Sequence, residues 1–170
     1  LHCEPTDSGL GAVRVAKRAT SSASFVLADD SFGTTGPGIG LSADELGLYA
    51  GDDQGIPVAT QSPQFYTRTS LTSPFADPQP IRGLEGTGLV APFVTPDGLD
   101  LIGSQRGVLV AAHRQSTSVA FGPLETLFTP ATDVWNSSPV PSRDCSSLYY
   151  LEIKTRTLDV DPVVVRVASR

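Results

Sequence analysis

Apolar and polar residues alternate most regularly near the C-terminal end of the chain. Segment 149–156 carries apolar residues at Tyr149, Leu151 and Ile153 and charged residues at 152, 154 and 156, and segment 163–167 has valines at 163, 165 and 167 with an arginine at 166. Because successive side chains of a strand point to opposite faces, these segments predict two strands with one apolar and one charged face. We expect the two apolar faces to close off a hydrophobic interior.

Shorter apolar runs fill most of the remaining chain and end at turn residues roughly every 8–12 residues, which predicts an all-β protein. Runs 89–94 and 99–102 flank a Thr-Pro-Asp-Gly turn and predict a hairpin, and runs 107–113 and 116–121 suggest a second one. Residues 108–112 are apolar on both faces, so we expect a central strand that is buried on both sides or lines a cavity.

These runs amount to about ten or eleven strands, and no motif repeats at a fixed period, which weighs against a β-trefoil or a propeller. We predict an all-β, single-domain antiparallel β-barrel or two-sheet sandwich. It has long Gly/Pro-rich loops and at most one or two short helical turns. Within the chain, residues 1–22 form an N-terminal arm and residues 23–170 form the single β domain.

Composition narrows the classes of partner. The chain has 170 residues and a net charge of −6, so it lacks the basic surface that nucleic acid requires. No run approaches the roughly 18 apolar residues of a membrane-spanning helix. We therefore expect a soluble, acidic protein with neither nucleic acid nor membrane among its partners.

Several features favour secretion. Cys3 and Cys145 are either free thiols or a disulfide, and the Ser/Thr/Gly/Pro-rich, Lys-poor composition favours a disulfide that ties the arm to the β domain. Asn136 begins an Asn-Ser-Ser glycosylation triplet, although Pro139 directly after it reduces its use. The dibasic pair Lys17-Arg18 is a processing site or part of a solvated arm.

Catalytic and metal-binding motifs are absent from the sequence. It contains two histidines, His2 and His113, and neither a nucleophile elbow nor a phosphate-binding loop. The acidic pair at 52–53 lacks the alternating spacing of a calcium loop, which leaves metal binding there open. We predict a protein that is not an enzyme; its cofactor is unknown, and a bound small organic ligand is the candidate. A hydrolase that uses His113 is a third alternative.

The favoured function is that of a secreted carrier that holds a small apolar or aromatic, pigment-like molecule in a pocket of the β framework. The candidate ligand-binding residues are His113 at the end of the most apolar strand, Tyr66 and Arg68 at i and i+2, and Trp135 in a Pro/Ser-flanked loop. The alternative is a lectin-like or protease-inhibitor-like protein that binds carbohydrate or protein through its long loops. A homodimer formed by edge strands is also open.

Overall fold

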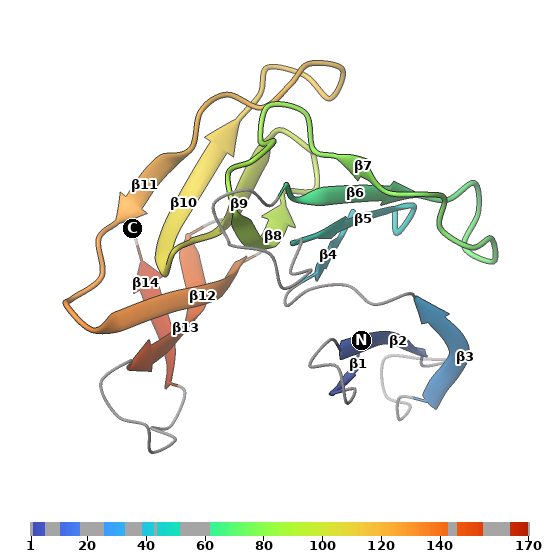
Figure 1. Cartoon of the computed structure of the whole chain (residues 1–170), viewed down its shortest axis with the longest axis horizontal. Helices are drawn as coiled ribbons and strands as arrows, with labels where there is room; N and C mark the ends of the chain where they lie inside the picture. The colour runs from blue at the N-terminus through green and yellow to red at the C-terminus, as the bar shows by residue number, and fades with distance from the viewer. Residues whose placement is uncertain are drawn as a thin grey trace.

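The computed structural model describes residues 2–5, 11–17, 26–32, 39–42, 44–51, 62–142, 146–154 and 164–169, with the backbone alone in the first three ranges and at residue 169. The described part contains fourteen strands and no helix (Figure 1). Every pair of neighbouring strands in the sheets is antiparallel. No helix that could cross a lipid bilayer is found among the described residues.

The strands form four sheets in the described part, and each sheet consists of strands that follow one another along the chain. The N-terminal sheet has β1 (His2–Pro5), β2 (Gly11–Lys17) and β3 (Val26–Phe32). The first four-stranded sheet has β4 (Ile39–Leu41), β5 (Gly47–Ala50), β6 (Gln64–Thr67) and β7 (Gln79–Pro80). The second has β8 (Leu89–Val94), β9 (Asp100–Gln105), β10 (Val108–His113) and β11 (Glu125–Phe128). The C-terminal sheet has β12 (Val134–Pro141), β13 (Ser147–Lys154) and β14 (Val164–Ser169).

The predicted all-β, antiparallel fold is confirmed. None of the sheets in the described part closes on itself, so the sandwich arrangement fits and the barrel does not. Strands β4 and β5 contact β8 of the next sheet, and β12 contacts β8, β9 and β10. The last three sheets therefore pack in succession, with β4, β8 and β12, the first strand of each of these three sheets, as neighbours.

The same turn connects the first and second strands of three of the sheets. The Ser42 amide donates to the Gly47 carbonyl (2.9 Å), and the Gly47 amide donates back to the Ser42 hydroxyl (2.7 Å). Thr95 and Asp100 make the equivalent pair of bonds at 2.9 and 3.0 Å. Ser142 makes them with the residue five positions on, at 2.8 and 2.9 Å.

These turns correct the expectation that no motif repeats. The hydroxyl residues stand at positions 42, 95 and 142, about 50 residues apart, a spacing typical of repeat architectures. In the first two turns an aspartate two residues on, Asp44 or Asp97, accepts a hydrogen bond from the hydroxyl. The sequence conceals the repeat because the units share little beyond this hydroxyl and this carboxylate. Repetition of short meander sheets is also how β-propellers are built.

Strand predictions were accurate where turn chemistry is strong. The hairpin around residues 95–98 is confirmed as β8 and β9. The predicted strand 108–112 is confirmed as β10, which lies between β9 and β11 and is largely buried. The predicted strand 116–121 is wrong, because β10 pairs instead with β11 at 125–128.

Strand β12 was also missed, because Pro139 and Pro141 suggested a loop. Strand β12 is at the edge of its sheet, where a residue without an N–H group need not interrupt a ladder. Strand β5 pairs with β4 on one side and with β6 on the other.

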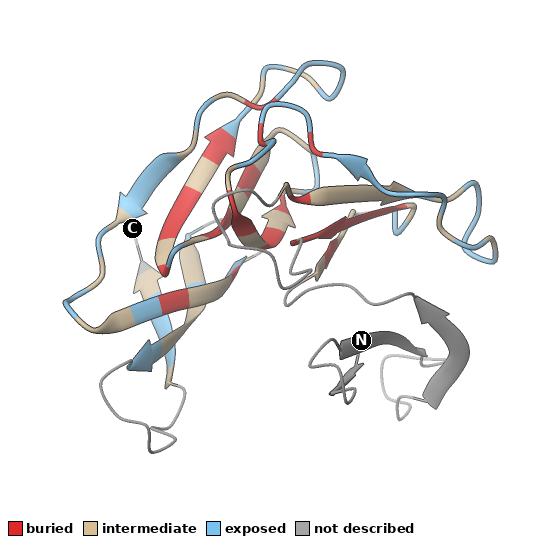
Figure 2. Ribbon diagram, viewed as in Figure 1, coloured by how far each residue is buried: buried red, intermediate tan, exposed pale blue. Residues whose placement is uncertain are grey.

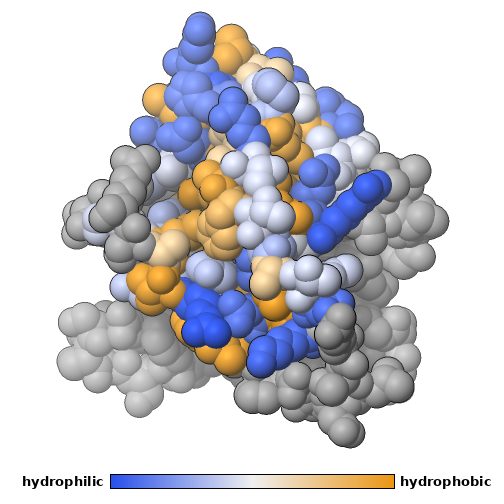
Figure 3. Space-filling model, turned by 90° about the vertical axis from the view of Figure 1, so that its left-hand side faces the viewer, coloured by the Kyte–Doolittle hydropathy of each residue, from blue (hydrophilic) through white to orange (hydrophobic). Residues whose placement is uncertain are grey.

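The C-terminal strands confirm the predicted alternation but correct its consequence. Tyr149 pairs with Val167, and Leu151 with Val165, so the apolar side chains share one face. That face is open, since Tyr149, Val165 and Val167 are 45%, 63% and 54% exposed (Figure 2). The apolar side chains that gather on the side of the molecule where β11 to β14 lie can be seen in Figure 3. The expectation that these strands enclose a hydrophobic interior is therefore wrong.

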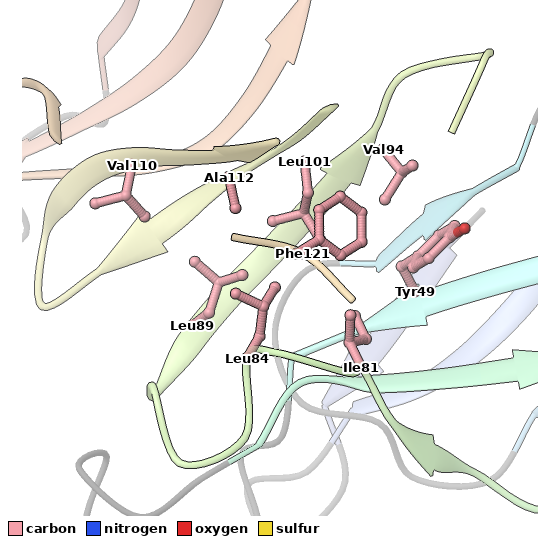
Figure 4. Close-up of a cluster of buried hydrophobic side chains, with 9 residues drawn as sticks. All are labelled: Tyr49, Ile81, Leu84, Leu89, Val94, Leu101, Val110, Ala112 and Phe121. Carbon is pink, nitrogen blue, oxygen red and sulfur yellow. The ribbon is translucent and has the colours of Figure 1, made fainter. Parts of the chain in front are cut away.

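The hydrophobic core instead lies between the two four-stranded sheets. It contains nine buried side chains, which come from β5, β8, β9, β10 and the connecting segments (Figure 4): Tyr49, Ile81, Leu84, Leu89, Val94, Leu101, Val110, Ala112 and Phe121. Burial of these apolar side chains holds the first four-stranded sheet against β8, which is the first strand of the second four-stranded sheet.

The predicted division of the chain at residue 22 stays a prediction. Strands β1 and β2 lie before this boundary and β3 lies after it, within one sheet. Cys3 lies in β1, while Cys145 lies outside the described residues, so the disulfide also stays a prediction. Lys17 ends β2, and Arg18 lies outside the described residues.

Candidate functional site

A cleft of about 900 Å³ opens where the first four-stranded sheet meets the turn between β8 and β9. Its lining comes from the turn between β4 and β5, from β5, β6 and β7, from the segment after β7, from the turn between β8 and β9 and from the segment after β10. The lining residues are Ser42, Asp44, Leu46, Gly47, Tyr49, Phe65, Thr67, Arg68, Gln79, Pro80, Ile81, Arg82, Glu85, Pro96, Asp97, Gly98, Arg114, Thr117 and Phe121.

Aromatic side chains form one wall of the cleft. The rings of Tyr49 and Phe65, on the paired strands β5 and β6, lie 4.6 Å apart between centroids. Gly47 leaves the space that Phe65 occupies, since a Cβ there would lie only 2.8 Å from Phe65 Cε2. Phe121 contributes a third ring. This wall can hold a flat apolar group by stacking and burial.

Arg114 lies over the Phe121 ring, with its guanidinium carbon 4.3 Å from the ring centroid. Its Nε donates to the Gly98 carbonyl (2.7 Å) and its Nη1 to the Thr117 carbonyl (3.3 Å). Burial raises the pKa of Tyr49, and the neighbouring Arg114 opposes that shift. Arg114 is thus held at the aromatic wall by neutral partners.

Two further arginines line the cleft. Arg68 donates from Nε to the Glu45 carbonyl (2.9 Å) and from Nη1 to the Leu71 carbonyl (3.0 Å). Arg82 Nη2 donates to the Ser118 carbonyl at 2.6 Å. Within the described residues no carboxylate forms an ion pair with any of the three guanidiniums. Their charges are therefore positioned by backbone carbonyls and are available to a ligand.

Three carboxylates line the cleft: Glu85, whose Oε2 accepts a hydrogen bond from the Gly83 amide (2.9 Å), and Asp44 and Asp97, which belong to the repeated turns. Asp44 Oδ1 accepts bonds from the Ser42 hydroxyl and the Leu46 amide (2.5 and 3.0 Å), and these bonds lower the pKa of Asp44. The Thr95 hydroxyl, followed by the Leu99 amide, lowers the pKa of Asp97 in the same way. Both aspartate side chains are therefore ionised at neutral pH, and each has one oxygen engaged by its own turn.

The structure places one of the four predicted ligand-binding residues, Arg68, in this cleft. Tyr66 lies on β6 next to two lining residues but is not itself part of the lining. Trp135 packs on the turn between β9 and β10, where a Cβ on Gly107 would lie 2.7 Å from the indole Cγ. Tyr66, Arg68 and His113 therefore do not line this cleft together.

His113 lies at the end of β10, with Nδ1 2.7 Å from Asp100 Oδ1 on the paired strand, and both side chains are exposed. It directly precedes Arg114, and its charge, when protonated, helps to lower the pKa of Asp97. His113 therefore lies near the cleft without lining it. In the described part of the chain no group of three or more His, Cys, Asp or Glu side chains could hold a metal ion.

Asn136, the predicted glycosylation residue, is 2% exposed on β12. Its backbone amide donates to the Gly107 carbonyl (2.8 Å), and its backbone carbonyl accepts from the Ser104 hydroxyl (2.6 Å). The side-chain Oδ1 is buried without a hydrogen-bond partner. The folded chain does not present this side chain for a glycan.

Sequence reasoning missed Tyr49, Arg82, Arg114 and Phe121. No pattern in the sequence links Arg114 to Tyr49, 65 positions earlier in the chain. Sheet packing brings these residues together, so no local signal could have grouped them.

Comparisons with protein-family models and with curated sequences find no match. Among solved structures, a luciferin-regenerating enzyme superposes with a TM-score of 0.55 and 14% sequence identity, over 94% of this chain and 52% of that one. The chain thus spans about half the length of this neighbour. At that identity the similarity establishes the fold alone. It nevertheless corrects the prediction that the protein is not an enzyme, because a chain of this fold is named as one.

Proposed function

We propose that this protein binds a small molecule that combines a flat apolar body with an anionic group, in the cleft between the two four-stranded sheets. The observation that carries the proposal is the set of three guanidiniums, held by backbone carbonyls beside an aromatic wall. A volume of about 900 Å³ falls within the range of small-molecule sites, roughly 300–1,000 Å³.

The chemistry of the lining supports this class of ligand over a purely apolar one. Arginine presents a planar set of donors that matches a carboxylate or phosphate, and its bond to such a group is stronger than a neutral one. Arg114 lies directly on the Phe121 ring, so one ligand can stack on the aromatic wall and reach the guanidinium. Donors of their own turns already occupy Asp44 and Asp97, which weakens their competition for the arginines.

The test uses 1-anilinonaphthalene-8-sulfonate as an anionic aromatic probe and N-phenyl-1-naphthylamine as its neutral analogue. In a fluorescence titration, Arg114→Gln should bind the sulfonate at least about 10-fold more weakly than the wild type does, which is the loss expected for one charge-assisted hydrogen bond. Binding of the neutral analogue should change little. Arg106→Gln is the matched control, because Arg106 is exposed and lies outside the lining.

Equal affinity of the wild type for the two probes, or an unchanged sulfonate affinity in Arg114→Gln, would refute the proposal. Thermal unfolding of each variant establishes that it is folded. Val165→Glu, which alters an exposed apolar residue elsewhere, identifies any probe bound outside the cleft.

A second candidate function is catalysis on the bound molecule. It is supported by the name of the luciferin-regenerating enzyme and by the His113–Asp100 pair near the cleft. A carboxylate that holds one imidazole nitrogen orients the other to accept a proton. Ligands that bind would be incubated with the protein and followed by mass spectrometry. Turnover that His113→Gln abolishes without loss of affinity would establish this function, and recovery of every ligand unchanged would exclude it.

A further inference from the structure

The C-terminal sheet carries an uncharged face that is apolar except for Ser137, which pairs with Leu151 between Trp135 and Val140. Registration of β12, β13 and β14 places Trp135 opposite Ile153, and Tyr149 between Val140 and Val167. All five side chains, and Val165 on the same face, are at least 36% exposed. We call this set the valine face: Trp135, Val140, Tyr149, Ile153, Val165 and Val167.

Charged groups of this sheet lie on its other face. Arg166 donates from Nη2 to Glu152 Oε1 at 2.9 Å, a diagonal pair across β13 and β14. Lys154 alternates with Ile153 and so points away from the valine face. The six side chains of the valine face are therefore uncharged, although the whole chain carries a net charge of −6.

The exposed area of the valine face is large for a surface that meets only water. Six side chains that are one third to two thirds exposed present on the order of 500 Å² of apolar area, near the upper end for the largest patch on a monomer. A standard interface buries about 800 Å² on each partner. With its polar rim, the valine face is of the size that a stable dimer needs.

Packing elsewhere in the chain indicates what kind of surface covers such a face. The second four-stranded sheet is contacted by β4 and β5 on one side and by β12 on the other. The C-terminal sheet is contacted by this neighbour through β12, and in the described part of the chain no further sheet covers the valine face. The expected cover is therefore another antiparallel sheet with an apolar face.

We propose that a second copy of this chain supplies that sheet, and that two valine faces pack against each other across a two-fold axis. An apolar face without charges is complementary to itself, which a two-fold interface requires. The luciferin-regenerating enzyme, 52% of which this chain matches, contains nearly as much structure again, and a second copy would add a comparable amount. Sheets packed in this way lie about 10 Å apart, with their side chains interdigitated.

Sedimentation equilibrium of the full chain between about 1 and 100 µM tests the proposal. The wild type should approach twice the monomer mass of 17.8 kDa. Val165→Glu should weaken the dimer at least about 100-fold, because it places two buried charges at the two-fold interface. Val119→Glu is the matched control, since Val119 is 45% exposed and lies outside the valine face.

A wild type that remains monomeric up to about 100 µM overturns the proposal, as does a dimer that Val165→Glu leaves intact, which would indicate edge pairing. Coverage of the valine face by other residues of a longer chain also overturns it. Val167→Gln repeats the test if circular dichroism shows that Val165→Glu is unfolded. Because the valine face is separate from the cleft, retained ligand binding in a monomeric Val165→Glu distinguishes failure of this proposal from failure of the proposed function.

Discussion

Replacement of Thr95 by valine tests the repeated turn that connects β8 and β9 in the second four-stranded sheet. The Thr95 hydroxyl accepts a hydrogen bond from the Asp100 amide (3.0 Å) and donates to Asp97 Oδ1 (2.6 Å). Valine keeps the shape of the side chain and removes both bonds. A bond between a hydroxyl and a partly buried backbone amide contributes about 1 kcal/mol, so Thr95→Val should lower the free energy of unfolding by about that amount.

Urea unfolding followed by circular dichroism measures the effect. With a slope of about 2 kcal/mol per molar urea, the midpoint should fall by about 0.5 M. Thr126→Val is the matched control, because Thr126 is exposed on β11, and its midpoint should stay within about 0.2 M of the wild type. Equal midpoints for Thr95→Val and Thr126→Val would show that the hydroxyl does not stabilise the turn.

The same substitution makes a prediction about pH. The Thr95 hydroxyl is the largest cause of the lowered pKa of Asp97, so Thr95→Val should raise that pKa toward its ordinary value. A carboxyl whose pKa is lower in the folded than in the unfolded state adds stability above the unfolded pKa. That contribution is lost as the pH falls through the folded pKa. The wild type should therefore lose more stability than Thr95→Val on acidification below about pH 4, and parallel curves would contradict the assignment.

Three further predictions concern packing and burial. Leu101→Ala should lower the free energy of unfolding by about 2–5 kcal/mol because Leu101 is fully buried, whereas Leu127→Ala, at an exposed residue, should cost less than about 1 kcal/mol in the same urea assay. Gly47→Ala should weaken naphthalene-probe binding, since its Cβ would displace the Phe65 ring; unchanged affinity would place the probe elsewhere. Protein expressed through a secretory host should carry no glycan on Asn136, so its mass should not change after enzymatic deglycosylation.

The C-terminal strands show how far alternation predicts a structure. A period of two establishes that Tyr149 and Val165 share a face, and the register confirms it. Alternation does not establish what covers that face, because burial depends on elements distant in sequence. The strands were therefore predictable, and the hydrophobic interior inferred from them was not.

The cleft was largely beyond prediction for a related reason. Tyr49 belongs to β5 and Phe65 to β6, while Arg114 follows β10, so packing between two sheets assembles the lining. Arg68 was identified as a candidate because it stands beside aromatic residues in the sequence. Its partner there, Tyr66, lies outside the lining, because it points to the face of β6 opposite to Phe65 and Thr67, which line the cleft. Arg68 follows the last residue of β6, so the alternation of the strand does not determine its direction.

The repeated turn explains why the cleft lies where it does. The turns that contain Asp44 and Asp97 belong to successive sheets, and both line the cleft, together with Arg114. Where the second four-stranded sheet meets the C-terminal sheet, the two sheets are bonded directly. The Asn136 backbone amide donates to the Gly107 carbonyl, and the Asn136 backbone carbonyl accepts from the Ser104 hydroxyl. Similar sheets thus meet at two junctions. At the first, between the two four-stranded sheets, arginine and aromatic side chains surround the cleft. At the second, next to the C-terminal sheet, hydrogen bonds to the backbone of Asn136 join the sheets. The specificity of the site therefore depends on the residues at the first junction, and substitutions that leave the turns intact should alter ligand choice without altering the fold.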